Sequence, residues 1–227
     1  MRTKRILKVT LGSVVNGIVV AMAALGNVIA YHFYNYLIGA LVYGVIYGIG
    51  VFVYNYFFMT ESVHVEGKIK DHIVDVLIGF VVSLVTIALM GNLIRFSLFG
   101  DKYGETVDSL ISGKMAAHPL SVVGLAIVTG LCIGIMKLAI KGTTKKSHHY
   151  LITVVIAFAY VAMGSSPYIS ELMYVSLSHK LFTGQGILHL LLLLAGNYIG
   201  FLVTLPFAKA FKEPKVLETK EEQTKNE

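Results

Sequence analysis

Long apolar stretches, separated by short polar segments, run along most of the chain. From Val9 to Thr60 there are 52 consecutive residues without Asp, Glu, Lys or Arg. A helix needs about 20 apolar residues to cross the hydrocarbon core of a membrane, so this stretch is long enough for two crossings. Residues 31–36 form an aromatic and polar cluster of the kind that lies at a membrane interface, and we take it as the division between them. The pattern therefore predicts membrane-spanning helices.

Four further apolar segments follow, which gives an all-α integral membrane protein with six transmembrane helices. The predicted spans are residues 9–31, 36–58, 73–94, 117–139, 150–177 and 186–208. Together they predict one membrane domain over residues 1–210. The charged tail that follows, residues 211–227, has little apolar side-chain area to bury, and we expect it to be disordered.

Composition excludes several classes of protein. Hydrophobic residues make up 56% of the chain and charged residues only 14%, whereas a soluble domain carries about 25% charged residues. A water-soluble enzyme and a disordered chain are thereby excluded. The net charge of +6 does not indicate a nucleic-acid binder, because the basic residues lie between apolar segments rather than on one face. The single cysteine, Cys132, allows neither a disulfide within the chain nor a cysteine-based metal site.

The distribution of Lys and Arg predicts the orientation. Fifteen of these 19 residues lie at the N-terminus, in residues 61–72 and 137–146, and in the tail. The other four, on the opposite side, are Arg95, Lys102, Lys114 and Lys180. The positive-inside rule then places both termini in the cytoplasm. The basic start leads directly into the first span without a signal-peptidase-like site, so we expect a retained anchor rather than a cleaved signal peptide.

Two spans carry signals for an interruption. Gly164 and Pro167 stand in the middle of the fifth span, where Pro cannot donate to the helix ladder. The second span ends in a polar and aromatic stretch, residues 55–61. Broken helices in corresponding positions of two halves, here spans 1–3 and 4–6, are typical of an aquaporin-like inverted repeat with a transport site at the breaks. The alternative is a proline kink in the fifth span and an ordinary interfacial end of the second.

Small residues also predict close helix packing, since they let backbones approach each other in lipid. In the fourth and sixth spans these residues are Gly124, Gly130, Gly134, Gly196 and Gly200.

The order of these features resembles the formate/nitrite transporter (FNT) family, small-anion channels with six spans and broken second and fifth helices. The sixth span, L-A-G-N-Y-I-G from Leu194, is similar to the family's L-G-N-x-I-G signature. The fifth span, Y-V-A-M-G-S-S-P-Y-I-S-E-L-M from Tyr160, is similar to its F-V-A-x-G-F-E-H-x-x-A-N-M. The loop around Lys114 resembles its lysine-containing stretch before the fourth span. The resemblance implies a homopentamer with one pore in each protomer.

The chain departs from the family pattern at the family's central histidine. That position falls on Pro167 here, or on Ser166 if the register shifts by one, and the asparagine after the motif becomes Glu171. The E-L-F-T loop of the second span is not reproduced in residues 55–58. These differences affect the proton-linked part of the family mechanism more than the fold. We therefore expect an anion flux whose pH dependence follows only the protonation of the permeant itself, unless a desolvated Glu171 carboxylate or His118 or His179 in the outer vestibule restores pH sensitivity.

The residues of the candidate substrate pathway are chosen for three tasks: attracting the anion, forming narrow apolar constrictions, and replacing the water that the anion loses. Lys114 is the candidate for attracting an anion, and an ordinary loop lysine is the alternative. Aromatic side chains are candidates for narrow apolar constrictions that gate the pore by dewetting, and core packing is the alternative for each of them. Polar groups between two such constrictions would replace the water that the anion loses. The aromatic candidates are Tyr160, Tyr56, Phe57 and Phe58; the polar ones, with the break itself, are Ser165, Ser166, Pro167, Asn197 and Asn55.

The resulting hypothesis is a channel or transporter for small monovalent anions such as formate, nitrite or hydrosulfide in the plasma membrane of a prokaryote. Its partners would be the anion, the lipid bilayer and further copies of the chain, with no nucleic acid, cofactor or metal. The histidines, including His189, are assigned no role in the site, and His118 and His179 are expected near the outer face. A non-transporting scaffold or regulatory protein of the same fold is the main alternative. An intramembrane enzyme is disfavoured because the spans lack paired carboxylates and metal-ligand clusters.

Overall fold

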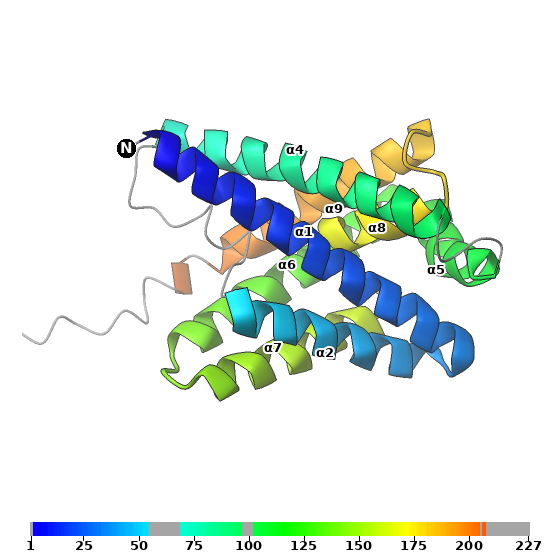
Figure 1. The fold of residues 1–227 in the computed structure, drawn as a ribbon, viewed down its shortest axis with the longest axis horizontal. Helices are drawn as coiled ribbons and strands as arrows, with labels where there is room; N and C mark the ends of the chain where they lie inside the picture. Colours follow the sequence, from blue (N-terminus) through cyan, green and yellow to red (C-terminus); the bar gives the residue numbers. More distant parts are fainter. Residues whose placement is uncertain (1, 55–68, 97–101, 205, 208–227) are drawn as a thin grey trace, which may run out of the picture.

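The computed structural model describes residues 2–54, 69–96, 102–204 and 206–207, and its regular structure there is helical throughout (Figure 1). In chain order the helices are α1 (Arg2–Phe33), α2 (Tyr36–Tyr54), α4 (Ile69–Ile94), α5 (Gly104–Ala116), α6 (Pro119–Lys141), α7 (Lys146–Ala162), α8 (Tyr168–Leu177) and α9 (Gly184–Val203). Within these residues, α1, α4, α6 and α9 are long and apolar enough to cross a membrane, and α2 is a shorter apolar helix. The all-α class of an apolar, membrane-type fold is confirmed, whereas the count of six spans stays a prediction.

The helices pack both within and across the two predicted halves. α1 packs against α2 and α4, α6 packs mainly against α9, and α2 packs against α7. The pairs of the first span with the third, the fourth with the sixth and the second with the fifth are those that an inverted repeat would give, whereas α1 contacts α2 more extensively than α6 contacts α7. The N-terminal end of α1, the α6–α7 turn and the C-terminal end of α9 lie at one end of the bundle (Figure 1). The side of the membrane that this end faces stays a prediction, as does the inverted repeat.

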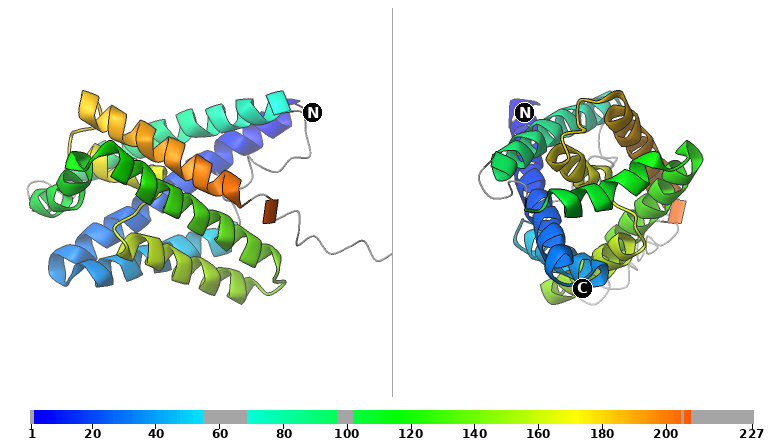
Figure 2. Two further views of the ribbon diagram at one scale, coloured as in Figure 1. Left: turned by 180° about the vertical axis from the view of Figure 1, so that it is seen from behind. Right: turned by 90° about the vertical axis from the view of Figure 1, so that its right-hand side faces the viewer.

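The loop expected before the fourth span is a helix in the structure. α5 covers the end of the bundle opposite the N-terminus, as Figure 2 shows in its right-hand view along the long helices. Its buried side chains are Val107, Leu110, Ile111 and Met115, which recur three to four residues apart. This spacing forms one apolar face on a helix. With 13 residues, α5 is too short to register as a membrane span, which is why the search for long apolar stretches missed it.

α6 and α9 approach each other backbone to backbone, as predicted from their glycines. A Cβ atom added at Gly200 would lie 2.0 Å from the carbonyl oxygen of Ile127. One added at Gly130 would lie 2.1 Å from the carbonyl oxygen of Asn197. Close packing is therefore confirmed at these glycines. The expectation was wrong for Gly124, since nothing lies within 4 Å of the place where its Cβ would be.

We expect Gly200→Ala to lower the free energy of unfolding by about 1–3 kcal/mol, the usual cost of overpacking a well-packed contact. The added methyl group meets backbone, which cannot move aside without separating the two helices. Gly124→Ala is the matched control in the same helix pair and should be neutral or slightly stabilising, because alanine is the better helix former. Thermal unfolding of both purified variants in detergent measures the difference. Equal melting temperatures would contradict the close approach.

The fifth predicted span consists of two helices with an extended segment between them. α7 ends at Ala162, Gly164 adopts a left-handed conformation with a φ of 78°, and α8 begins at Tyr168. Pro167 precedes α8 with φ −57° and ψ 145°. All ten residues of α8 are buried, so this short helix lies inside the bundle among the longer ones (Figure 2). The corresponding break predicted in the second span, at residues 55–61, lies outside the described residues.

Candidate functional site

The break between α7 and α8 is held by side chains from α2 and α9. Tyr36 of α2 donates a hydrogen bond to the carbonyl oxygen of Val161, in the last turn of α7. From α9, Asn197 accepts a hydrogen bond of 2.9 Å from the backbone N–H of Tyr168. Its amide also donates to the carbonyl oxygen of Ala126 in α6, at 3.0 Å. Backbone groups inside a bilayer must find partners, and these contacts satisfy them where the helix ladder is interrupted.

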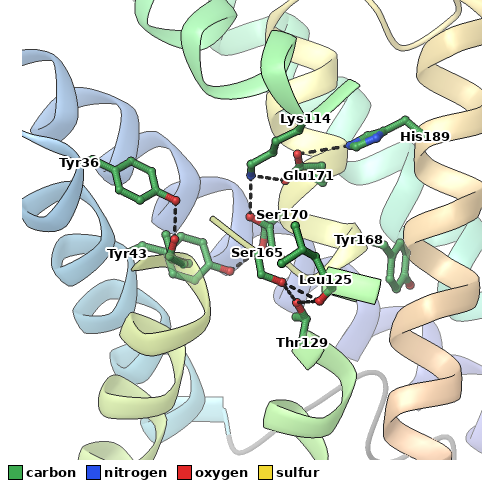
Figure 3. Close-up of polar contacts among 12 residues, drawn as sticks. Tyr36, Tyr43, Lys114, Leu125, Thr129, Ser165, Tyr168, Ser170, Glu171 and His189 are labelled. Carbon is green, nitrogen blue, oxygen red and sulfur yellow. Dashed lines mark hydrogen bonds and ion pairs between the residues drawn. The ribbon is translucent and has the colours of Figure 1, made fainter. Parts of the chain in front are cut away.

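Ser165 joins the break to α6. Its hydroxyl donates to the carbonyl oxygen of Leu125 at 2.9 Å and shares a hydrogen bond with the hydroxyl of Thr129 (Figure 3). Pro167 occupies the position before the first residue of α8, where a missing N–H leaves no helix bond unmade. The sequence G-S-S-P therefore ends one helix, crosses to a neighbour and starts the next.

Three ionisable side chains meet beside this break, each from a different helix (Figure 3). The ammonium of Lys114, in the last turn of α5, lies 3.0 Å from Oε2 of Glu171 in α8. It also donates to the hydroxyl of Ser166 at 3.2 Å. Nε2 of His189 in α9 lies 3.4 Å from Oε1 of Glu171. The carboxylate therefore has one oxygen directed to each basic group, and we call Lys114, Glu171 and His189 the ion cluster.

The ion cluster is withdrawn from solvent to different degrees. The side chains of Glu171 and His189 are 1% and 4% exposed, whereas that of Lys114 is 22% exposed. Burying a charge costs several kcal/mol unless it is paired and hydrogen-bonded, so the pairing of Glu171 is a condition of its burial. Lys114 is therefore the member of the ion cluster that lies nearest to the outside of the bundle.

A small cavity of about 40 Å³ connects the ion cluster to the break. Its volume is sufficient for one small ion or a water molecule or two. Apolar side chains of α6 and α9 complete the wall around the polar residues. These polar lining residues are Lys114, Glu171, His189, Ser165 and Ser166. A cavity with ionisable side chains at a helix interruption can hold and orient a small charged solute.

The predicted pathway residues separate into three groups in the structure. Lys114, Ser165 and Ser166 line the cavity, and Pro167 stands next to it at the start of α8. Tyr160 and Asn197 do not line it. Tyr160 is fully buried with its ring edge-to-face on Tyr43, and the side-chain amide of Asn197 uses its oxygen and its nitrogen in hydrogen bonds within the protein. Residues 55–58, namely Asn55, Tyr56, Phe57 and Phe58, lie outside the described residues.

Sequence reasoning missed His189 as a member of the site and considered Glu171 only as a departure from a motif whose carboxylate could make the flux pH-dependent. The signal that could have identified both residues is that each is ionisable and lies within an apolar span, where an ionisable residue by default indicates a functional site. The other two histidines considered for the outer face do not line the cavity. The ring of His118 is exposed and caps the start of α6, and His179 follows α8 with a positive φ. In the described part of the chain, no three His, Cys, Asp or Glu side chains are grouped as metal ligands would be.

Comparisons with known proteins give different results for the sequence and for the structure. No family model and no curated protein sequence matches the chain. Solved structures do match it. One is described as a pentameric formate channel with formate bound: the TM-score is 0.73 at 12% identity, over 91% of this chain and 96% of that one. Another is described as an FNT family ion channel: the TM-score is 0.74 at 17% identity, over 90% of each chain. The chain therefore has the fold of the FNT channels.

Proposed function

We propose that the protein is a channel or transporter for small monovalent anions across the plasma membrane, assembled as a homopentamer with both termini in the cytoplasm. The observation that carries the proposal is the position of the Lys114 ammonium. It lines a small cavity beside the first turn of the half-helix α8. A cation surrounded by low-dielectric walls attracts small anions strongly, and the N-terminal end of a helix adds a positive partial charge.

The structural neighbours support the proposal that the solute is a small, singly charged anion. One of them is described as holding formate and as pentameric. A cavity of about 40 Å³ has room for a small anion. Formate, nitrite and hydrosulfide are candidates of this size, and the homopentamer is the assembly that such a neighbour favours.

A scaffold or regulatory protein that kept the fold and lost transport is the second candidate function. One observation favours it: the charge of Lys114 is already matched by Glu171 at 3.0 Å. An ion pair in the pathway lowers the attraction for a further anion. Flux in proteoliposomes with formate, nitrite, nitrate, chloride and acetate distinguishes the two functions. Anion-dependent flux supports the channel, whereas the absence of flux for every anion between pH 5 and 8 would reject it and favour the scaffold.

We expect Lys114→Gln to lower anion flux about tenfold or more, because the attraction exerted by a focused charge is lost. Lys114→Arg should retain most of the flux, since the charge remains. Lys180→Gln is the matched control: this lysine pairs at 3.9 Å with Asp108 in α5, and it does not line the cavity. Lys114 is half-buried, so raising the ionic strength should leave most of its effect in place. Equal fluxes for the Gln and Arg variants would show that the charge does not assist entry.

A further inference from the structure

The turn between α6 and α7 brings basic side chains together at the end of the bundle where the N-terminal end of α1 also lies (Figure 1). Lys145, Lys146 and His148 are exposed there, and we call these three residues the turn patch. His149 is half-buried, and its Nε2 donates to the carbonyl oxygen of Thr143 at 2.9 Å, which closes the turn. The side chains of the turn patch therefore stand on a well-defined turn and face the surroundings of the protein.

The positive charge of the turn patch has no acidic counterpart on the described helices around it. α6 and α7 pack against each other, and their other main partners are α9 and α2. None of these four helices contains Asp or Glu. Elsewhere the structure pairs basic groups with carboxylates, in the pairs Arg5–Asp75, Lys114–Glu171 and Lys180–Asp108. The turn patch is therefore a place where the charge of the protein calls for an anion from outside the chain.

The start of α7 adds to this positive potential. Lys145 is the N-cap residue of α7, its side chain makes no capping hydrogen bond, and the first turn contains no acidic residue. By comparison, α6 and α9 begin at His118 and Thr183, whose side chains accept a hydrogen bond from a backbone N–H. The first N–H groups of a helix carry a positive partial charge and favour anions. The turn patch thus combines fixed cations with the positive end of a helix.

An exposed apolar face of α7 continues from the turn patch along the bundle. Leu151 and Val155 are 59% and 54% exposed. Lys145, His148, Leu151 and Val155 follow one another at intervals of three or four residues, which places them on one side of the helix. A phospholipid has the same order of chemistry, with a charged phosphate at one end and apolar acyl chains behind it. The face is therefore complementary to a lipid whose headgroup is negatively charged.

We propose that this face of α7 is a binding site for an anionic phospholipid, whose phosphate lies at Lys145, Lys146 and the first turn of α7 and whose acyl chains cover Leu151 and Val155. The inference uses the proposed orientation but is independent of transport. Under that orientation the turn patch lies at the cytoplasmic surface of the membrane. Anionic lipids there attract basic side chains by about fivefold in affinity for each Lys or Arg.

Fluorescence quenching by brominated lipids tests the proposal on the full chain in vesicles. The chain has no tryptophan, so a single one introduced as Val155→Trp reports on this face alone. Vesicles that mix brominated phosphatidylglycerol with unbrominated phosphatidylcholine, and vesicles with the bromine on the other lipid, give the relative affinity of the two lipids.

We expect the anionic phosphatidylglycerol to bind at this face at least about fivefold more tightly than phosphatidylcholine. Equal affinities for the two lipids would overturn the proposal. Absence of quenching by either lipid would overturn it as well, because protein rather than lipid would then cover the face.

Removing the charges of the turn patch should remove the preference. Lys145→Gln with Lys146→Gln, made in the reporter protein, should lower the relative affinity for phosphatidylglycerol about fivefold or more, to a value close to one. Lys4→Gln with Lys8→Gln is the matched control, because it removes the same charge from two exposed lysines at the same end of the bundle, and it should retain the preference.

Quenching in vesicles of brominated phosphatidylcholine alone should be the same for all these proteins, which shows that the face stays folded and open to lipid. An unchanged preference in the variant of Lys145 and Lys146 would overturn the proposal. An equal loss in the variant of Lys4 and Lys8 would also overturn it, because the preference would then reflect the overall charge of this end rather than a site on α7.

Discussion

Replacing Lys114 with methionine is expected to lower the free energy of unfolding by about 3–5 kcal/mol, the usual cost of leaving a buried charge without its partner. Glu171 is 1% exposed, and its ion pair with Lys114 measures 3.0 Å. In the variant the carboxylate keeps only His189 as a basic neighbour. We therefore expect the loss to be smaller at pH 5 than at pH 8, because a proton on the Glu171 carboxylate removes its unpaired charge. Unfolding by SDS in mixed micelles measures this free energy.

The double variant Lys114→Met with Glu171→Met is the control for this prediction. It removes both charges and fills the same space with apolar atoms, a replacement that is often neutral or even stabilising for a buried ion pair. We expect its stability to return to within about 1 kcal/mol of the unmodified protein. Lys180→Met, which changes an exposed pair, should have little effect, as is usual for surface ion pairs. A double variant as unstable as the single one would show that Glu171 does not depend on Lys114.

Asn197→Leu is expected to cost about 2–4 kcal/mol of unfolding free energy, because it removes two hydrogen bonds and leaves a buried donor without a partner. Asn197 is fully buried and accepts from the backbone N–H of Tyr168, the first residue of α8. Nothing else in the described contacts holds this N–H. We also expect a clear loss of anion flux, since the start of α8 sets the position of Ser166 and Glu171 relative to Lys114.

Asn92→Leu provides the matched control within another long helix. Asn92 is exposed and donates to the carbonyl oxygen of Ala88 in its own helix, α4. Its replacement should change stability by no more than about 0.5 kcal/mol, as for most surface substitutions. Parallel SDS titrations and flux assays compare the two variants. If Asn197→Leu behaves like Asn92→Leu, the amide does not hold the half-helix in place.

Sequence alone could predict the long helices and the position of one interruption. The lengths of the apolar stretches correspond to membrane thickness, so α1, α4, α6 and α9 follow from hydropathy. Gly164 and Pro167 mark the segment between α7 and α8 because their backbone chemistry is local. α5 was missed because its apolar face is visible only at helical spacing.

The ion cluster could not be assembled from the sequence. Lys114 and Glu171 are 57 residues apart, and Glu171 and His189 are 18 apart, on three different helices. Only the packing of α5, α8 and α9 brings their side chains to one cavity. Asn197 illustrates the opposite error. It was predicted to face the solute, whereas in the structure it binds backbone groups. The sequence pattern does not distinguish these two roles for a polar residue in an apolar helix.

The buried half-helix α8 has a consequence for how the chain is made. Its ten residues span about 15 Å, half of the hydrocarbon thickness, so it cannot cross a membrane by itself. Membrane helices insert first and associate afterwards. α9, which supplies both Asn197 and His189, leaves the ribosome after α8, whereas α1, α4 and α5, which also contact α8, are made before it. The contacts of α8 are therefore completed only after α9 has been inserted.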